Sequence, residues 1–158
     1  MKSKMILAVA ALLAASLSPG RERERPTPSG PQFKYVGGTE KLVPHCEGNL
    51  ELGSTALTFR CPEGSITILY DSISQMQYRP DVSKKIWKMK LKWKMRPDVD
   101  SPIVSSKHNR YFTVLYGTKD ATQAMVLDVT PEAMRPYLAE IDLKAGKRVE
   151  VRSFEDYD

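Results

Sequence analysis

The chain has 158 residues and a net charge of +5, and 27% of its residues are charged. This length suits one domain with extensions, and this charge content is typical of a soluble globular surface. Lys2 and Lys4 are the only charges in residues 1–18, and removing them from the 24 basic residues leaves 22 against 19 acidic ones, a net charge of +3. So mild a balance argues against a nucleic-acid-binding protein.

Residues 1–18, MKSKMILAVAALLAASLS, are predicted to be a secretory signal peptide. Two lysines precede an apolar run at residues 5–15 that is too short to span a bilayer. Small residues place the expected cleavage after Ser16, whereas cleavage after Ser18 is disfavoured because Pro19 would follow it. An uncleaved N-terminal anchor is the alternative. No other segment is apolar enough to cross a membrane, so the protein is expected outside the cytoplasm, either periplasmic or secreted.

Residues 19–34 are predicted to be a disordered linker. Its stretch PGRERERPTPSGP alternates Arg with Glu, and its prolines and glycines oppose regular structure. The folded domain is then expected at residues 35–152, and a polar tail at 153–158. Within the domain, Gly37 and Gly38 precede no helix and are interpreted as an ordinary turn.

The two cysteines bracket CEGNLELGSTALTFRC, which is predicted to be a β-hairpin. If Gly53 and Ser54 form a type II′ turn, opposite residues have numbers that sum to 107, and the apolar side chains gather on one face. Cys46 then lies opposite Cys61, at a Cα separation of about 4.5–5.5 Å that a disulfide can bridge. Because an exported chain meets an oxidising compartment, a Cys46–Cys61 disulfide is predicted. Two free buried thiols are the alternative.

Four further strands are predicted by short apolar or alternating runs, at residues 65–70, 73–79, 109–116 and 121–129. Met76 and Tyr78 are the expected inward residues of the second of these strands. Met125, Leu127 and Val129 share one face of the last strand. A short edge strand is also expected at residues 147–152.

After these strands the apolar pattern changes to a helical period. Thr130 is suited to the N-cap, Pro131 to the first helical position and Glu132 to the first turn. The apolar stripe comprises Met134, Tyr137, Leu138 and Ile141. Gly146 is expected to end the helix. Pro136 removes a backbone donor, so either the helix kinks there or the helix proper begins near it.

The most unusual segment is KKIWKMKLKWKMRP, residues 84–97. Its apolar residues alternate strictly with Lys88, Lys90, Lys92, Lys94 and Arg96, a pattern that predicts a strand about 30 Å long with one basic face. Repulsion along this face is on the order of 1 kcal/mol after screening, so no ligand is required. The simpler interpretation is a solvated face that protects a strand edge. The sharper one is an anion-binding surface flanked by Lys84, Lys85 and Lys107.

Counting this segment, seven strands precede one helix. The stretches GNLELGSTALTF, ITILYDSISQMQY, RYFTVLYG and LAEIDLKAGKRVEV, within residues 46–151, resemble the pleckstrin-homology (PH) superfold and its bacterial PH-like relatives. The resemblance implies a mainly β fold, a seven-stranded, partly open barrel of two packed antiparallel sheets capped by one C-terminal helix. It also implies binding of lipids, peptides or proteins rather than catalysis. The phosphoinositide site of such domains does not carry over, because the Gly53-Ser54 loop has no basic residue and only Arg60 lies on the next strand.

No motif for a nucleotide, a catalytic serine or a metal is present, and His45 and His108 are the only histidines. The sequence therefore predicts a protein that is not an enzyme and has no cofactor, no metal and no nucleic-acid partner. The expected function is that of an exported binding or scaffold module that contacts an anionic lipid, an anionic polymer or an acidic protein through the lysine-rich strand. The alternative is a structural envelope protein that self-associates without a specific ligand.

Overall fold

The computed structural model describes residues 30, 32–97, 110–117 and 120–152. The predicted signal peptide, most of the predicted linker and the tail at 153–158 lie outside these residues. In chain order the elements are β1 (Phe33–Gly38), β2 (Glu47–Leu52), β3 (Ala56–Cys61), β4 (Gly64–Leu69), the 3-10 helix η1 (Tyr70–Ser72), β5 (Ile73–Arg79), α1 (Lys84–Trp87), β6 (Arg110–Gly117), β7 (Thr122–Val129), α2 (Pro131–Ala145) and β8 (Glu150–Val151).

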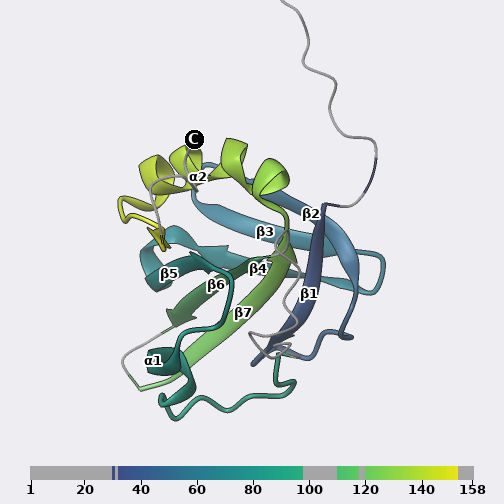
Figure 1. The fold of residues 1–158 in the computed structure, drawn as a ribbon, viewed down its shortest axis with the longest axis vertical. Helices are drawn as coiled ribbons and strands as arrows, with labels where there is room; N and C mark the ends of the chain where they lie inside the picture. The colour runs from purple at the N-terminus through teal and green to yellow at the C-terminus, as the bar shows by residue number, and fades with distance from the viewer. Residues whose placement is uncertain (1–29, 31, 98–109, 118–119, 153–158) are drawn as a thin grey trace, which may run out of the picture.

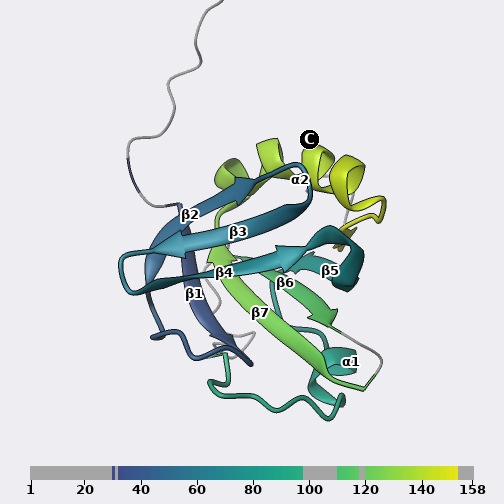
Figure 2. The same cartoon turned by 180° about the vertical axis from the view of Figure 1, so that it is seen from behind.

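The strands form an open sheet in the order β4-β3-β2-β1-β7-β6-β5-β8. Neighbouring strands are antiparallel, except that β8 runs parallel to β5. The helix α2 covers one end of the curved sheet, whereas α1 and the chain that follows it lie at the opposite end (Figure 1, Figure 2). The predicted mainly β class with one main helix near the C-terminus is therefore confirmed.

Over the described ranges, the sequence pattern predicts one strand that is absent and misses one that is present, so the predicted number of strands before α2 is still correct. The lysine-rich residues 84–97 form α1 and then an irregular extended segment whose one isolated bridge joins Met95 to Gly38. Conversely, β1 is a strand that the sequence pattern does not reveal, because two glycines end it. It begins at Phe33, two residues before the expected start of the domain, and both Phe33 and Tyr35 are buried.

The β2–β3 hairpin has the predicted faces in a different register. Leu50 lies opposite Phe59 and Leu52 opposite Leu57, so paired numbers sum to 109 instead of 107. The turn is wider than expected because the Gly53 N–H donates to the carbonyl of the residue three positions on, at 2.9 Å. A displacement of two residues preserves which side each residue faces, because strand side chains alternate with period two. The apolar face is accordingly directed into the core.

The predicted disulfide joins Cys46 and Cys61, whose Cα atoms are 6.1 Å apart. In the observed register Gly48, rather than Cys46, lies across from Cys61. A Cβ atom added to Gly48 would stand only 2.9 Å from the Cys61 Cβ, so a glycine is required where these strands meet. The disulfide therefore forms diagonally across the end of the hairpin and confirms the predicted pairing.

The main core lies between the sheet and α2. Its most deeply buried members include Phe33, Tyr35, Leu57, Phe59, Ile68, Met76, Tyr78, Phe112, Val114, Met125, Leu127, Met134, Leu138 and Ile141. The inward residues predicted for β5, β7 and α2, Val129 included, belong to this core, apart from the half-buried Tyr137, which packs against it. Among the described residues, no helix has the length and apolar content needed to span a membrane.

The caps of α2 agree with the sequence. The Thr130 hydroxyl accepts a hydrogen bond from the Ala133 N–H at 3.4 Å, and Gly146 adopts a left-handed conformation with φ of 62°. The helix runs through Pro136 as one element, which settles the choice between one helix and two. The Lys144 ammonium donates to the Leu52 carbonyl at 2.7 Å and so ties the end of α2 to β2.

Candidate anion-binding site

A second core lies on the opposite face of the sheet. Five of its buried residues lie on β1, β6 and β7, namely Val36, Tyr111, Leu115, Ala124 and Val126. The other two, Val82 and Ile86, come from the chain after β5. Ser83 caps α1 by accepting a hydrogen bond from the Ile86 N–H at 3.5 Å, and Ile86 is fully buried. This short helix therefore fixes the start of the chain that covers the outer face.

The chain from residue 88 to residue 97, hereafter the lysine segment, covers this second core. Four half-buried apolar side chains pack on it, Trp87, Met89, Leu91 and Trp93. The alternating basic side chains are all exposed, namely Lys88, Lys90, Lys92, Lys94 and Arg96. The sequence therefore identified correctly which side chains face the protein and which face solvent.

The path of this chain differs from a strand. The rings of Trp87 and Trp93 are 5.5 Å apart between centroids. In a strand, six residues would separate these two positions by about 20 Å. The chain consequently curls so that the two tryptophans meet on the second core.

The far end of the lysine segment is hydrogen-bonded to the end of β1. The Gly38 N–H donates to the Met95 carbonyl at 3.0 Å, and the Lys94 N–H donates to the Gly38 carbonyl at 3.0 Å. A Cβ atom added to Gly37 would lie 2.6 Å from the Pro97 nitrogen. The glycine pair thus ends a strand and permits the close approach of a second chain, which corrects its interpretation as an ordinary turn.

The basic side chains of the lysine segment differ from some other lysines of the described chain in having no ion pair. None of them has an ion-pair partner there, whereas Lys34 pairs with Glu47 at 3.4 Å and Lys144 with Glu140 at 2.6 Å. The flanking Lys84 and Lys85 are also exposed. The third flanking residue proposed from the sequence, Lys107, lies outside the described residues.

Three of these lysines border a hollow of about 250 Å³ at the end of the β6–β7 hairpin. Its lining comprises Lys90, Lys92, Lys94, Thr39, Asp120, Ala121, Thr122 and Gln123. Sequence reasoning found the lysines but placed them along a flat strand, and it missed the side of the hollow formed by β7. No local pattern joins these positions, because they come together only when the lysine segment curls over the sheet.

The floor of the hollow is fixed by β7. The Thr39 N–H donates to the Ala124 carbonyl at 2.9 Å, and the Ala124 N–H donates to the Thr39 hydroxyl at 3.0 Å. These reciprocal bonds hold the chain after β1 against the first residues of β7. The position of Thr39 is thus set before any ligand binds.

Two tyrosines hold the next residue from inside the sheet. The Tyr116 hydroxyl donates to the Glu40 carboxylate at 2.8 Å, and the Tyr35 hydroxyl donates to the Glu40 carbonyl at 3.3 Å. Burial, with a smaller contribution from the Glu40 charge, raises the pKa of Tyr35 to about 12. Burial and the hydrogen bond to Glu40 raise the pKa of Tyr116 as well. Both hydroxyls therefore remain protonated donors at neutral pH.

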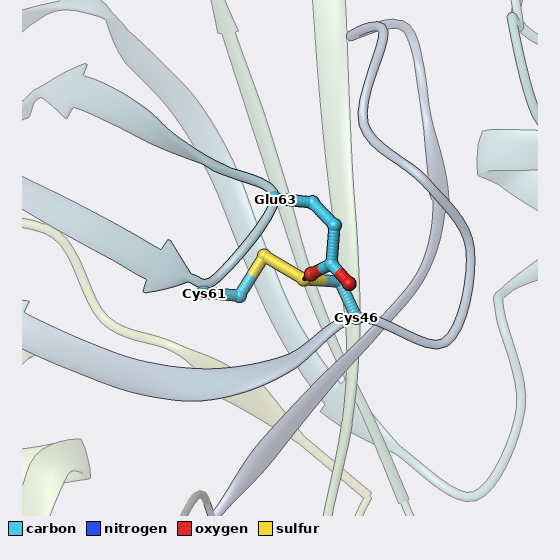
Figure 3. A group of neighbouring side chains, drawn as sticks. All are labelled: Cys46, Cys61 and Glu63. Carbon is cyan, nitrogen blue, oxygen red and sulfur yellow. Dashed lines mark hydrogen bonds between the residues drawn. A yellow bond between two sulfur atoms is a disulfide. The ribbon is translucent and has the colours of Figure 1, made fainter.

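A different cluster surrounds the disulfide. In Figure 3 the Glu63 carboxylate points at the Cys46 sulfur, and the two atoms are in close contact. Within the described part of the chain, the one group of three potential metal ligands is Cys46, Cys61 and Glu63, whose ligand atoms lie within 4.8 Å of one another. Metal binding by cysteine requires a thiolate, and both sulfurs are committed to the disulfide. The two cysteines therefore serve as a covalent cross-link between the residue that precedes β2 and the end of β3.

Comparison of the sequence with models of known protein families and with curated proteins found no significant match.

Proposed function

We propose that this protein is an exported, PH-like, non-catalytic binding module whose lysine segment docks on an anionic lipid surface. The PH-like assignment is supported by seven strands that are antiparallel to their neighbours, from β4 to β5 in the order of the sheet, and by α2 across one end of the sheet. The signal peptide predicted from the sequence and the Cys46–Cys61 disulfide support export, because disulfides persist in oxidising compartments.

The observation that carries the proposal is the row of exposed basic side chains without ion-pair partners among the described residues. A basic residue close to an anionic membrane contributes about 1 kcal/mol of binding free energy. The four lysines of the segment would together supply roughly 4 kcal/mol. Such binding is weak, reversible and well suited to a docking surface.

The contact is electrostatic rather than hydrophobic. The apolar side chains between the lysines, including Trp87 and Trp93, pack against the second core and are not directed into a bilayer. Stable membrane anchoring usually needs two signals, and here only the charge is available. Binding should therefore disappear as salt screens the charges.

The simpler interpretation, in which the lysines form a solvated face that protects a strand edge, lacks its main physical basis in this structure. Lysines protect an exposed strand edge from pairing with another chain. Within the part of the chain that the structure describes, the lysine segment has only one bridge to the sheet and does not form such an edge. An anionic partner accounts better for five exposed basic side chains that form no ion pair within the described chain.

Vesicle co-sedimentation at low salt tests the proposal. We expect the wild type to pellet with vesicles containing phosphatidylglycerol, and to be released by high salt. Lys88→Glu/Lys90→Glu/Lys92→Glu/Lys94→Glu should remain in the supernatant. A charge-matched control reverses four exposed basic residues elsewhere, Lys41, Arg60, Arg135 and Arg152. Equal, negligible pelleting of the wild type and the lysine-segment variant would contradict membrane docking.

Self-association is the second candidate function, and β4 favours it. This strand lies at one end of the sheet, and its Leu69 side chain is 57% exposed. An edge strand presents unpaired backbone groups that can pair with a second copy. Sedimentation equilibrium should then detect a dimer that Leu69→Lys weakens, and a wild type that is monomeric at high concentration would exclude this candidate.

A further inference from the structure

We propose that the hollow beside the lysine segment binds one phosphate monoester group. The inference deepens the proposed function, on which it rests in part, because it names the chemical group that the basic surface recognises. It concerns a bounded site of about 250 Å³ rather than the whole basic face.

The lining supplies the donors that a phosphate requires. Lys90, Lys92 and Lys94 each offer an ammonium group with three N–H donors and no acceptor. Thr122 lies on the same face of β7 as Ala124 and Val126 and offers a hydroxyl, and Gln123 completes this side of the lining. Hydrogen bonds from charged donors to phosphate oxygens are among the strongest in proteins.

The charge of the lining selects a dianion. Among the described residues of the lining, three lysines and Asp120 give a formal net charge of +2. A phosphate monoester carries roughly −1.5 to −2 at neutral pH. A carboxylate or a phosphate diester carries a single negative charge and would leave one ammonium uncompensated. Charge complementarity therefore favours a monoester over these other anions.

The size of the hollow fits one compact group. A water molecule occupies about 30 Å³ in the liquid, so the hollow has the volume of several waters. That space accommodates a tetrahedral phosphate and the first atoms of its ester, and the remainder of the ligand would extend into solvent. A membrane lipid or a free phosphorylated metabolite could each present such a group.

Two sides of the hollow are fixed in advance by hydrogen bonds to the backbone. The Lys94 N–H is bonded to the Gly38 carbonyl at 3.0 Å, and Thr39 is bonded reciprocally to Ala124. Lys84, Lys85 and Lys88 belong to the same stretch of sequence but do not line the hollow. The chain thus provides a matched set of three lysines inside the site and three outside it.

Isothermal titration calorimetry on the disulfide-bonded protein tests the inference with glycerol 3-phosphate as the probe. We expect Lys90→Gln/Lys92→Gln/Lys94→Gln to weaken binding by at least about tenfold, because charged hydrogen bonds are lost. Lys84→Gln/Lys85→Gln/Lys88→Gln removes the same charge and should leave this affinity within about twofold, since these lysines lie outside the hollow. Equal losses in the two variants, or no binding by the wild type, would overturn the discrete site.

Asp120→Asn provides a test with the opposite sign. Removing a negative charge from the lining should tighten the binding of glycerol 3-phosphate several-fold. A variant that folds badly would not gain affinity, so this result is separable from structural damage. An unchanged or weakened affinity would overturn the assignment of Asp120 to the site.

Vesicles distinguish the source of the phosphate and separate the two proposals. Stronger co-sedimentation with phosphatidic acid than with phosphatidylglycerol at equal charge would support a lipid monoester. Binding of glycerol 3-phosphate without sedimentation on either vesicle would support the hollow with a free ligand, and would contradict membrane docking. Salt-sensitive sedimentation without glycerol 3-phosphate binding would retain membrane docking and overturn the hollow.

Discussion

The β2–β3 hairpin and the lysine segment both alternate apolar and polar residues, but their backbones are held in different ways. The hairpin pairs residue by residue, from Leu52 with Leu57 to Asn49 with Arg60, and a disulfide closes its end. The lysine segment has one bridge, at Met95. Yet its side chains sort onto two sides as cleanly as those of the hairpin.

The difference follows from where each region meets the sheet. The hairpin lies within the sheet, where neighbouring strands offer donors and acceptors. The lysine segment covers the outer face of β1, β6 and β7, where the side chains beneath it are mainly apolar. Alternation of apolar and polar residues therefore indicates only that one side of the chain is buried. A strand also requires backbone hydrogen bonds to a neighbouring strand. Without a ladder the chain is free to curl, and the curl brings three lysines to one hollow.

The largest expected effect comes from the core beneath the hairpin. Phe59 is fully buried among the residues packed under α2. Phe59→Ala should lower the free energy of unfolding by about 3–5 kcal/mol, because it removes a large aromatic side chain and leaves a cavity. Urea denaturation followed by far-UV circular dichroism measures this loss. The exposed neighbour Arg60, changed to Ala, should alter stability by less than about 0.5 kcal/mol. A loss below about 1 kcal/mol for Phe59→Ala would contradict the core described here.

Removal of the disulfide is expected to have the next largest effect. Cys46 and Cys61 are separated by 15 residues, and closing a loop of this size stabilises a protein by about 3 kcal/mol in the chain-entropy model. Cys46→Ala/Cys61→Ala should show this loss in urea denaturation. Wild-type protein under reducing conditions provides the control and should approach the same stability. If the double variant unfolds at the same urea concentration as the wild type, the disulfide does not stabilise the fold.

Local features of the fold could be predicted from the sequence because local chemistry determines them. The hairpin faces follow from alternation, and the start and end of α2 follow from Thr130 and Gly146. The disulfide was predicted correctly although the register was wrong, because the bond requires only that the two cysteines lie close together. By contrast, β1 was missed because its terminal glycines carry no side-chain pattern. The path of the lysine segment was missed because alternation does not specify a backbone partner.

The candidate site divides along the same line. The basic side chains occupy alternate positions of one short segment and could be identified from the sequence, although the sequence pattern places them on a strand. Thr39 and the residues from Asp120 to Gln123 are distant in the chain from these lysines, and they reach the hollow only through tertiary packing. No motif marks them. The sequence therefore predicts the charged segment of this site but not the residues that the separate hairpin contributes.

Gly37→Ala should weaken the lysine segment selectively. The added Cβ would stand 2.6 Å from the Pro97 nitrogen, so the segment must move away from β1. Overpacking of this kind costs about 1–3 kcal/mol. Both tryptophans of the chain lie in this region, so their fluorescence reports on it alone, whereas circular dichroism reports on the sheet. The tryptophan emission should shift to longer wavelength while the sheet signal is retained.

Gly53→Ala is the control for that experiment. The nearest heavy atom to an added Cβ there is 3.1 Å away, and the residue lies in the hairpin turn, far from both tryptophans in the sequence. Its tryptophan emission should match that of the wild type. A wild-type emission spectrum for Gly37→Ala would mean that the segment does not depend on its contact with β1.

The smallest expected effect separates the two regions most sharply. Trp93 is half-buried and packs against Trp87 on the second core. Trp93→Ala should cost about 1 kcal/mol, less than a fully buried aromatic residue. Hydrogen exchange should accelerate at residues 88–97 and remain unchanged in β2 and β3, because the segment can open while the sheet stays folded. Equal acceleration in both regions would show that they unfold as one unit, and the lysine segment would then be as integral to the fold as the hairpin.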